Sequence, residues 1–511
     1  MKKNIVKTFI FMFSAIFLAK ILGLVRNIVF ANFYGTGAAA TAFFTASRIP
    51  LQLLDMSLGA AISSAFIPIF NEYLQKNGKD KAFQFANNFL NIIIVISLVL
   101  TLLGIVFAPQ IINIIAPDLE ASTFELTTVL IRILFPIMLF TAVAFVFVGF
   151  LQSLDEFNIP AIISVVANGI LILYLIIFND KFGIYGVAVA MLIGWGTQVL
   201  VQLPAVIKKG FHYQFTLNFK EEGIQKIVKL ALPILISTWV QPINNIVNIR
   251  IASGLEGGQA VAAIEYSYNL FLIIVGVFSY TLSNIIFPEL SKLTADNAKD
   301  RIRDLLKRAV KISLFFIIPM SAGIALLSNP IVKAVYERGE FTEHSTLLTA
   351  NALLFYAWGM IGYGLMEVLN KAFYAMQDSK TPMYVSGFAI ALNVILSVLL
   401  SKTMGYTGLP LAASITSIIT ACVMLYIVNR KNSGIIDNSS FYELAKILVS
   451  TGVMVILLKL LQKVNINSVI ISLVVSVGVG ILGYLIMMLL LKSETISEGI
   501  AEFKNRKRKK Q

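Results

Sequence analysis

The chain has 511 residues, of which 58% are hydrophobic and 13% are charged, and its mean hydropathy is +0.83. A soluble domain carries roughly 25% charged residues, so a water-solvated globule is excluded. Two His and one Cys exclude a disulfide framework and a Cys-rich zinc site. The net charge of +14 would indicate nucleic acid in a soluble protein, but in a membrane protein it first indicates which loops face the cytoplasm.

Long apolar runs, separated by short polar or Gly/Pro connections, fill the chain. A bilayer core about 30 Å thick needs roughly 20 apolar residues per helix. Lipid offers no hydrogen-bond partner to an open backbone, so each run predicts a transmembrane α-helix. We therefore expect an all-α integral membrane protein with about 14 transmembrane helices. The runs lie near residues 7–33, 41–70, 82–115, 124–152, 158–179, 184–207, 224–253, 258–290, 308–335, 345–376, 382–401, 408–429, 441–462 and 467–491.

Basic residues are divided unequally between the two sets of loops. With the N-terminus inside, most of the 41 Lys and Arg fall in cytoplasmic segments, including the pair at 208–209 and the tail at 504–510. The external loops instead carry acids such as Asp118 and Glu340. This asymmetry is the positive-inside pattern, and it predicts a multi-pass protein with both termini in the cytoplasm. The basic charge also predicts attraction to anionic membrane lipids, and we expect no nucleic-acid partner.

The chain repeats itself at one long spacing. A Gly-x-x-Gly-x-x-x-Ala pattern that begins at Gly183 recurs at Gly405, an offset of 222 residues, and Pro160 and Pro382 share that offset. Two six-helix repeats are the simplest explanation: an N-lobe at 1–212 and a C-lobe at 222–434. Six is even, so both repeats enter the membrane from the same face, as in transporters built from parallel repeats. Two further helices at 440–492 and a basic cytoplasmic tail at 493–511 lie outside the repeat.

Ionisable residues inside the apolar runs are the first candidates for function, because a charge within the bilayer is costly and faces a cavity or a partner. Lys20 and Arg26 lie in the first run, about 9 Å apart along a helix. Arg48 lies at a similar depth in the second run. Three cations in one half favour an anionic ligand such as a phosphate group. Internal neutralisation is the alternative, with Asp55 pairing Arg48.

Polar residues of the later runs offer a second set of candidates. Glu265 and Glu367 could pair the cations or carry protons or a coupling ion, and a purely structural ion pair is an equal alternative. Asn244 and Asn245 could ligate a cation, or could join helices through hydrogen bonds.

Enzyme signatures are missing from the sequence. It holds no Walker loop, no dinucleotide fingerprint and no HExxH motif, and no loop is long enough for a catalytic domain. We therefore expect a transporter without catalytic residues, bound metal or organic cofactor. The membrane potential, or coupling to Na⁺ or H⁺, would supply its energy.

Particular segments resemble those of a known family. The chain is similar to the MurJ (MviN) family of lipid II flippases through LGLVRN at 22–27, FYGTG at 33–37, RIP at 48–50, SAFIPIF at 64–70, FPELS at 287–291 and AFYAMQDSKTP at 372–382. These segments occur in the family's order along essentially the whole chain.

The resemblance implies a flippase of the MOP exporter superfamily, resident in a bacterial plasma membrane. Such proteins move the undecaprenyl-pyrophosphate-linked disaccharide-pentapeptide from the inner to the outer leaflet by alternating access, for peptidoglycan synthesis, cell-wall biogenesis and cell shape. The resemblance implies a cationic cavity for the pyrophosphate, with Lys20, Arg26 and Arg48 matching its basic positions. It also implies a groove for the lipid tail beside the last two helices.

The sequence departs from the family pattern at several positions. Lys20 replaces the usual Arg, and Asn269 stands where an Arg is frequent, so the cavity is less cationic.

The expected partners are lipid II, membrane lipids and cell-wall synthesis proteins, and we expect a monomer. Export of another polyprenyl-linked glycan is the alternative function.

Overall fold

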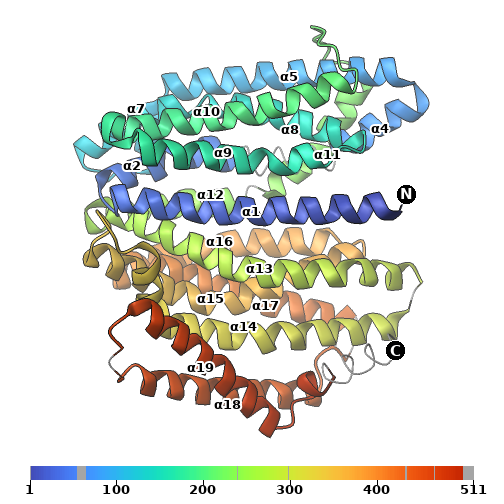
Figure 1. The fold of residues 1–511 in the computed structure, drawn as a ribbon. Helices are drawn as coiled ribbons and strands as arrows, with labels where there is room; N and C mark the ends of the chain where they lie inside the picture. The colour runs from blue at the N-terminus through green and yellow to red at the C-terminus, as the bar shows by residue number, and fades with distance from the viewer. Residues whose placement is uncertain are drawn as a thin grey trace. The chain divides into compact units, whose positions relative to one another are not determined.

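The computed structural model describes residues 2–53, 65–238, 240–296, 298–431, 434–464 and 466–498. Within these ranges the chain is helical and contains no β-strand, in agreement with the predicted all-α class. Packing divides the chain into two compact units (Figure 1). The first unit comprises Met1–Ala262 with Arg338–Phe341, and the second comprises Ala263–Glu337 with Thr342–Gln511.

The first unit contains the helices up to α12 and the beginning of α13. They are α1 (Lys2–Tyr34), α2 (Ala38–Arg48), the π-helical turn η1 (Ile49–Leu53), α4 (Ile67–Lys76), α5 (Lys79–Val106), α6 (Ala108–Ile115), α7 (Ala121–Leu134), α8 (Ile137–Ser153), α9 (Asn158–Ile177), α10 (Asn179–Lys208), α11 (Glu222–Thr238), α12 (Val240–Ala252) and the short η3 (Glu256–Gly258).

The second unit contains the rest of α13 and the helices that follow it. They are α13 (Gln259–Ala295), α14 (Lys299–Tyr336), α15 (Glu343–Ala375), α16 (Lys380–Met404), the short η4 (Gly405–Thr407), α17 (Gly408–Lys431), α18 (Asn438–Leu461) and α19 (Val469–Leu490).

Eleven helical stretches in the described ranges are long and apolar enough to span a membrane. They account for twelve of the predicted spans, because α16 and α17 together form one stretch, Lys380–Lys431. The other two predicted spans, 41–70 and 224–253, each include residues outside the described ranges. The chain is a multi-pass membrane protein.

The backbone repeats at the same spacing as the sequence. Gly183 adopts φ 55° and ψ −148°, and Gly405, 222 residues later, adopts φ 61° and ψ −143°. Positive φ is uncommon outside glycine, yet the same offset relates Asp155 (φ 59°) to Gln377 (φ 60°). Identical unusual torsions at one offset support two copies of one structural unit. The predicted lobe boundaries at 1–212 and 222–434 derive from this repeat and stay a prediction, since the compact units follow packing instead.

A proline inside α14 ties this helix to α19. Pro319 has no N–H, so the carbonyl four residues earlier, that of Phe315, receives no donor within the helix. The hydroxyl of Tyr484 donates to this carbonyl at 2.7 Å. Because a buried carbonyl without a partner is costly, the proline makes a contact from another helix necessary.

In the first unit, too, a proline frees a backbone carbonyl that a side chain of another helix binds. Pro109 stands just after the junction of α5 and α6, and it leaves the carbonyl of Ile105 without a helical donor. Arg132 of α7 donates to that carbonyl through Nε at 3.3 Å. A charged side chain of the membrane region therefore has a structural role here.

Candidate functional site

Arg26 is held by amide groups on two helices. The half-buried Arg26 donates from Nη1 to Asn168 Oδ1 of α9 at 3.1 Å, and from Nε and Nη2 to Asn27 Oδ1 at 3.2 and 3.0 Å. Asn168 is itself oriented by its bond from Nδ2 to the Ser164 carbonyl at 2.9 Å. The two amide oxygens therefore orient the guanidinium group.

Lys20 lines a pocket of about 520 Å³ formed by α1, α8, α9 and α10, which we call the polar pocket. Its polar lining consists of Lys20, Gln152, Ser164, Asn168, Trp195 and Gln198. Asn168 therefore belongs both to the pocket that contains Lys20 and to the bonds that hold Arg26. The structure brings these two predicted residues to one region of the first unit.

Most of the polar pocket was not predicted. Gln152, Asn168, Trp195 and Gln198 come from three helices distant from α1 in the sequence. Amide side chains inside apolar runs are the signal that could have marked them. An indole ring beside several amides is a surface that suits a sugar, because the ring offers an apolar face and the amides offer both donors and acceptors.

Arg48 ends α2 and is half-buried, directly before the π-helical turn η1. Its placement in the cationic cavity stays a prediction. Asp55, its predicted partner, lies outside the described residues.

The acidic candidates of the second unit lie on two helices. On α13, Asn269 Nδ2 donates to the backbone carbonyl of Glu265 at 3.0 Å. It also donates to Glu265 Oε1 at 3.2 Å, a bond between two side chains one helical turn apart. On α15, Glu367 accepts a bond of 3.4 Å from the hydroxyl of Ser283, which belongs to α13. A role for these groups in coupling stays a prediction.

Asn244 and Asn245 lie half-buried on α12 of the first unit. Among the described residues no group of three or more His, Cys, Asp and Glu side chains could hold a metal ion. The two asparagines would offer amide oxygens instead, and the cation site predicted there stays a prediction.

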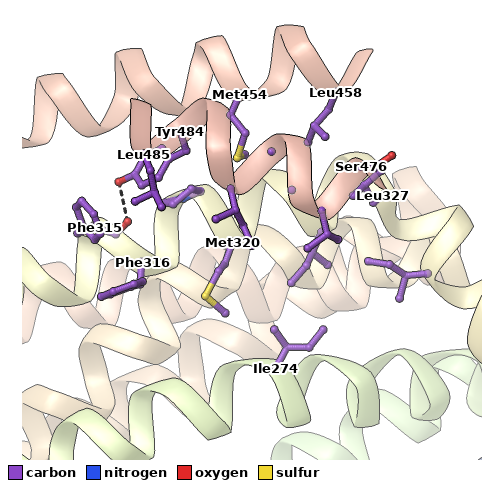
Figure 2. Close-up of a pocket in the computed structure, with 17 residues that line it drawn as sticks. Ile274, Phe315, Phe316, Met320, Leu327, Met454, Leu458, Ser476, Tyr484 and Leu485 are labelled. Carbon is purple, nitrogen blue, oxygen red and sulfur yellow. Dashed lines mark hydrogen bonds between the residues drawn. The ribbon is translucent and has the colours of Figure 1, made fainter. Parts of the chain in front are cut away.

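A second pocket, of about 360 Å³, lies within the second unit among α13, α14, α18 and α19. Figure 2 shows Phe316 and Met320 of α14 on one side of it and Met454 and Leu458 of α18 on another. Apart from Ser476 and the hydroxyl of Tyr484, its lining side chains are apolar. We call it the apolar pocket. An uncharged hydrocarbon is the ligand that its chemistry suits, because it offers almost no polar group.

The many spans and the repeated backbone define a multi-pass membrane protein with two similar halves. Solved structures share this fold. An inward-facing MATE family multidrug transporter of the MOP superfamily is similar with a TM-score of 0.69 at 15% identity, over 83% of this chain and 98% of that chain. At that identity the likeness shows the fold alone.

The family is shown by sequence. The model of the family described as lipid II flippase MurJ matches residues 30–492, and the chain belongs to this family. A solved lipid II flippase MurJ in an inward closed conformation is similar with a TM-score of 0.83 and 26% identity, over 94% of this chain and 99% of that chain.

Relatives named as probable lipid II flippases agree. The relative from Buchnera aphidicola subsp. Acyrthosiphon pisum is 28% identical over 459 residues, which cover 89% of this chain and 90% of the relative. The relative from Vibrio cholerae serotype O1 is 28% identical over 433 residues, which cover 83% and 82%. The predicted family is thereby confirmed.

Proposed function

We propose that this chain moves lipid II from the inner to the outer leaflet of a bacterial plasma membrane by alternating access, for peptidoglycan synthesis. Membership of the MurJ family supports the substrate. The observation that carries the mechanism is the shared position of Asn168, which binds Arg26 and lines the pocket that contains Lys20.

The polar pocket would receive the headgroup. A guanidinium and an ammonium are the side chains that best bind phosphate, the first as a fork of donors and the second as a compact charge. Arg26 and Lys20 supply one of each, and Arg48 is the third cation that we expect there. Trp195 and the amides of Gln152 and Gln198 would contact the sugars.

The apolar pocket would receive part of the polyprenyl tail. Lipid is already an apolar solvent for such a tail, so the pocket gains little from the hydrophobic effect. Its contribution is close packing against a chain that has no polar group. The chemistry of the lining supports this assignment, since Met320 and Met454 are unbranched, flexible side chains that adapt to an irregular hydrocarbon.

Transport requires an energy source that the chain does not generate chemically. We propose that no nucleotide is hydrolysed and that the membrane potential or a Na⁺ or H⁺ gradient drives the cycle. Moving one charge through 100 mV is worth about 2.3 kcal/mol. Glu265, Glu367, Asn244 and Asn245 are the candidates for ion coupling. The unequal distribution of Lys and Arg supports cytoplasmic termini.

Exposure of lipid II on the outer leaflet tests the proposal. The hosts would be bacteria depleted of their own flippase and supplied with the intact chain, with Arg26→Ala or with Arg301→Ala, and an impermeant enzyme would cleave the exposed headgroup. We expect the intact chain to restore cleavage and Arg26→Ala to lose about tenfold or more, which is 1.4 kcal/mol or more. Arg301 is an exposed cation at the start of α14, and its substitution should change nothing.

Two results would contradict the proposal in different ways. Normal exposure with a membrane-inserted Arg26→Ala variant would remove the anion site. No exposure with the intact chain, at normal membrane expression, would shift the substrate to another polyprenyl-linked glycan.

A further inference from the structure

Three asparagines of α5 hold the linker between α10 and α11. Asn87 donates to the His212 carbonyl at 3.0 Å and accepts from the Gln214 backbone N–H at 2.9 Å. Asn91 donates to the carbonyls of Gln214 and Thr216 at 2.9 and 3.0 Å.

The third asparagine, Asn88, fixes the end of the linker, because it donates to the Asn218 carbonyl at 2.9 Å and accepts from the Asn218 N–H at 2.7 Å. Along the linker, the backbone is bound first by Asn87, then by Asn91 and finally by Asn88, so residues 211–221 form an arch over this part of α5. The linker is the green chain that lies against α5 in Figure 1. We call it the linker arch.

The linker arch covers a part of α5 that would otherwise face outward. Every residue from 85 to 92 is buried, and the three asparagines are each 2% exposed. Farther along the same helix the outward face is bare and apolar, with Ile96 45% and Val106 64% exposed. On a helix of a membrane protein such a bare apolar face contacts lipid. The arch therefore stands beside the lipid-facing surface of α5.

The arch itself presents apolar side chains outward. Phe215 is 71%, Tyr213 60%, Phe219 53% and Leu217 42% exposed. The polar residues between them, Gln214, Thr216 and Asn218, are exposed as well, so the arch is an amphipathic surface with four large apolar side chains at alternate positions. Lys208 and Lys220, both exposed, flank this surface at its two ends.

The depth of the arch follows from helix geometry. Asn87 and Asn91 lie eight and twelve residues after Lys79, the first residue of α5, which corresponds to about 12 and 18 Å along the helix axis. With the lysines at 79 and 81 among the headgroups, Asn87 lies near the boundary between headgroups and hydrocarbon, and Asn91 lies about one helical turn deeper. Aromatic residues concentrate at that boundary, and lysines concentrate on its outer side.

We propose that the linker arch is a membrane-interface anchor whose partner is the phospholipid of the leaflet nearest the start of α5. Phe215, Leu217 and Phe219 insert among the acyl chains just below the headgroups, while the hydroxyl of Tyr213 donates to Asn91 Oδ1 at 2.9 Å and holds that ring against α5. Lys208 and Lys220 contact anionic headgroups.

The asparagines explain how an irregular loop tolerates this position. Backbone groups exposed to lipid have no water to bind and need partners within the protein. The amides of Asn87, Asn88 and Asn91 bind backbone groups of four linker residues, so these groups keep partners within the protein when the loop lies at the lipid surface.

Depth-dependent fluorescence quenching tests the anchor. Cys422 is the single cysteine, so Cys422→Ser provides a background in which Phe215→Cys carries the only label, an environment-sensitive NBD fluorophore. The full chain would be reconstituted into vesicles of phosphatidylcholine and phosphatidylglycerol, with a nitroxide near the top of the acyl chains or with iodide in the water. Leu482→Cys, on the exposed face of α19, is the lipid control, and Lys299→Cys is the aqueous control.

We expect the lipid nitroxide to quench the label at 215 several-fold more than the label at 299, and iodide to quench it less. Adding Asn91→Ala, which removes three of the bonds that hold the arch, including the one from the Tyr213 hydroxyl, should shift the label at 215 toward iodide. Quenching at 215 equal to that at 299 would overturn the anchor. An unchanged profile after Asn91→Ala would overturn the role of the asparagines in positioning it.

Discussion

The two halves of the molecule share backbone geometry but differ in the ligand chemistry they offer. Gly183 and Gly405 have matching torsions, 222 residues apart. The pocket of the first unit nevertheless contains Lys20 and several amides, whereas that of the second unit is lined by groups such as Met454. The repeated turns thus keep the backbone of the two halves alike, and the side chains on particular helices determine which ligand each half can bind. The predictions below test this difference.

The largest expected effect comes from placing a charge in the apolar pocket. Met454→Asp introduces a carboxylate at a site that is 5% exposed, and it should destabilise the protein by about 3 kcal/mol. Gln198→Glu is the matched change in the polar pocket and should cost less than about 1 kcal/mol. Thermal unfolding of both purified variants in detergent gives the comparison. Equal losses would mean that the two pockets do not differ in polarity as described.

The next effect concerns the hydroxyl that binds the carbonyl freed by Pro319. Tyr484→Phe should destabilise the second unit by about 2 kcal/mol, because the Phe315 carbonyl becomes a buried acceptor without a donor. Pro319→Ala restores an N–H four residues after that carbonyl. In that background we expect Tyr484→Phe to cost almost nothing, as a double-mutant cycle of unfolding midpoints would show. The same loss in both backgrounds would refute the link.

A smaller effect should follow from loosening Arg26 in the polar pocket. Asn168→Ala removes the amide that accepts from Arg26 Nη1, and lipid II exposure should fall about fivefold, or about 1 kcal/mol. Asn351→Ala, at an exposed position of α15, is the control and should leave exposure unchanged at equal expression. Unchanged exposure with Asn168→Ala would mean that Asn168 does not position the guanidinium.

The smallest effect distinguishes two equivalent turns of the repeat. Asp378 accepts bonds from Lys431 and Thr381, and these outweigh the effect of burial and lower its pKa to about 2. In the first unit, the equivalent Lys209 instead binds the Leu154 carbonyl at 2.7 Å. The stability of the second turn should therefore depend on the ionisation of Asp378.

The sign of this dependence follows from the lowered pKa. A folded-state pKa below the unfolded value of about 3.9 means that the stabilisation is fully present above that pH and is lost as the pH falls toward 2. Asp378→Asn should lower the free energy of unfolding at pH 7 by less than about 1 kcal/mol, as the shift of the unfolding midpoint would show. Glu156→Gln, the equivalent change in the first unit, should have no effect. A larger loss with Glu156→Gln would reverse the assignment.

The sequence predicted the fold because bilayer thickness fixes the length of each apolar run. It also predicted the repeat, since glycines and prolines mark turns whose torsions few other residues adopt. The π-helical turn after Arg48 was not predicted, because helix type depends on local packing that an apolar run does not specify.

The candidate site was predicted only in part. Lys20 and Arg26 stood out because charges are rare in apolar runs. Asn168 and Trp195 did not, since nothing in one sequence shows that α9 and α10 lie beside α1. The linker arch was also missed, because the hydrogen bonds of Asn87 to the linker join positions more than 120 residues apart.

The matching torsions have an evolutionary consequence. Asp155 and Gln377 are held at positive φ, a conformation that costs a non-glycine residue of order 1 kcal/mol. A shared cost at one offset is what the tandem duplication of a segment of about 222 residues, with this turn already present, would leave behind. A copy with the predicted even number of spans would insert in the orientation of its parent, so we expect the junction in the linker between α10 and α11.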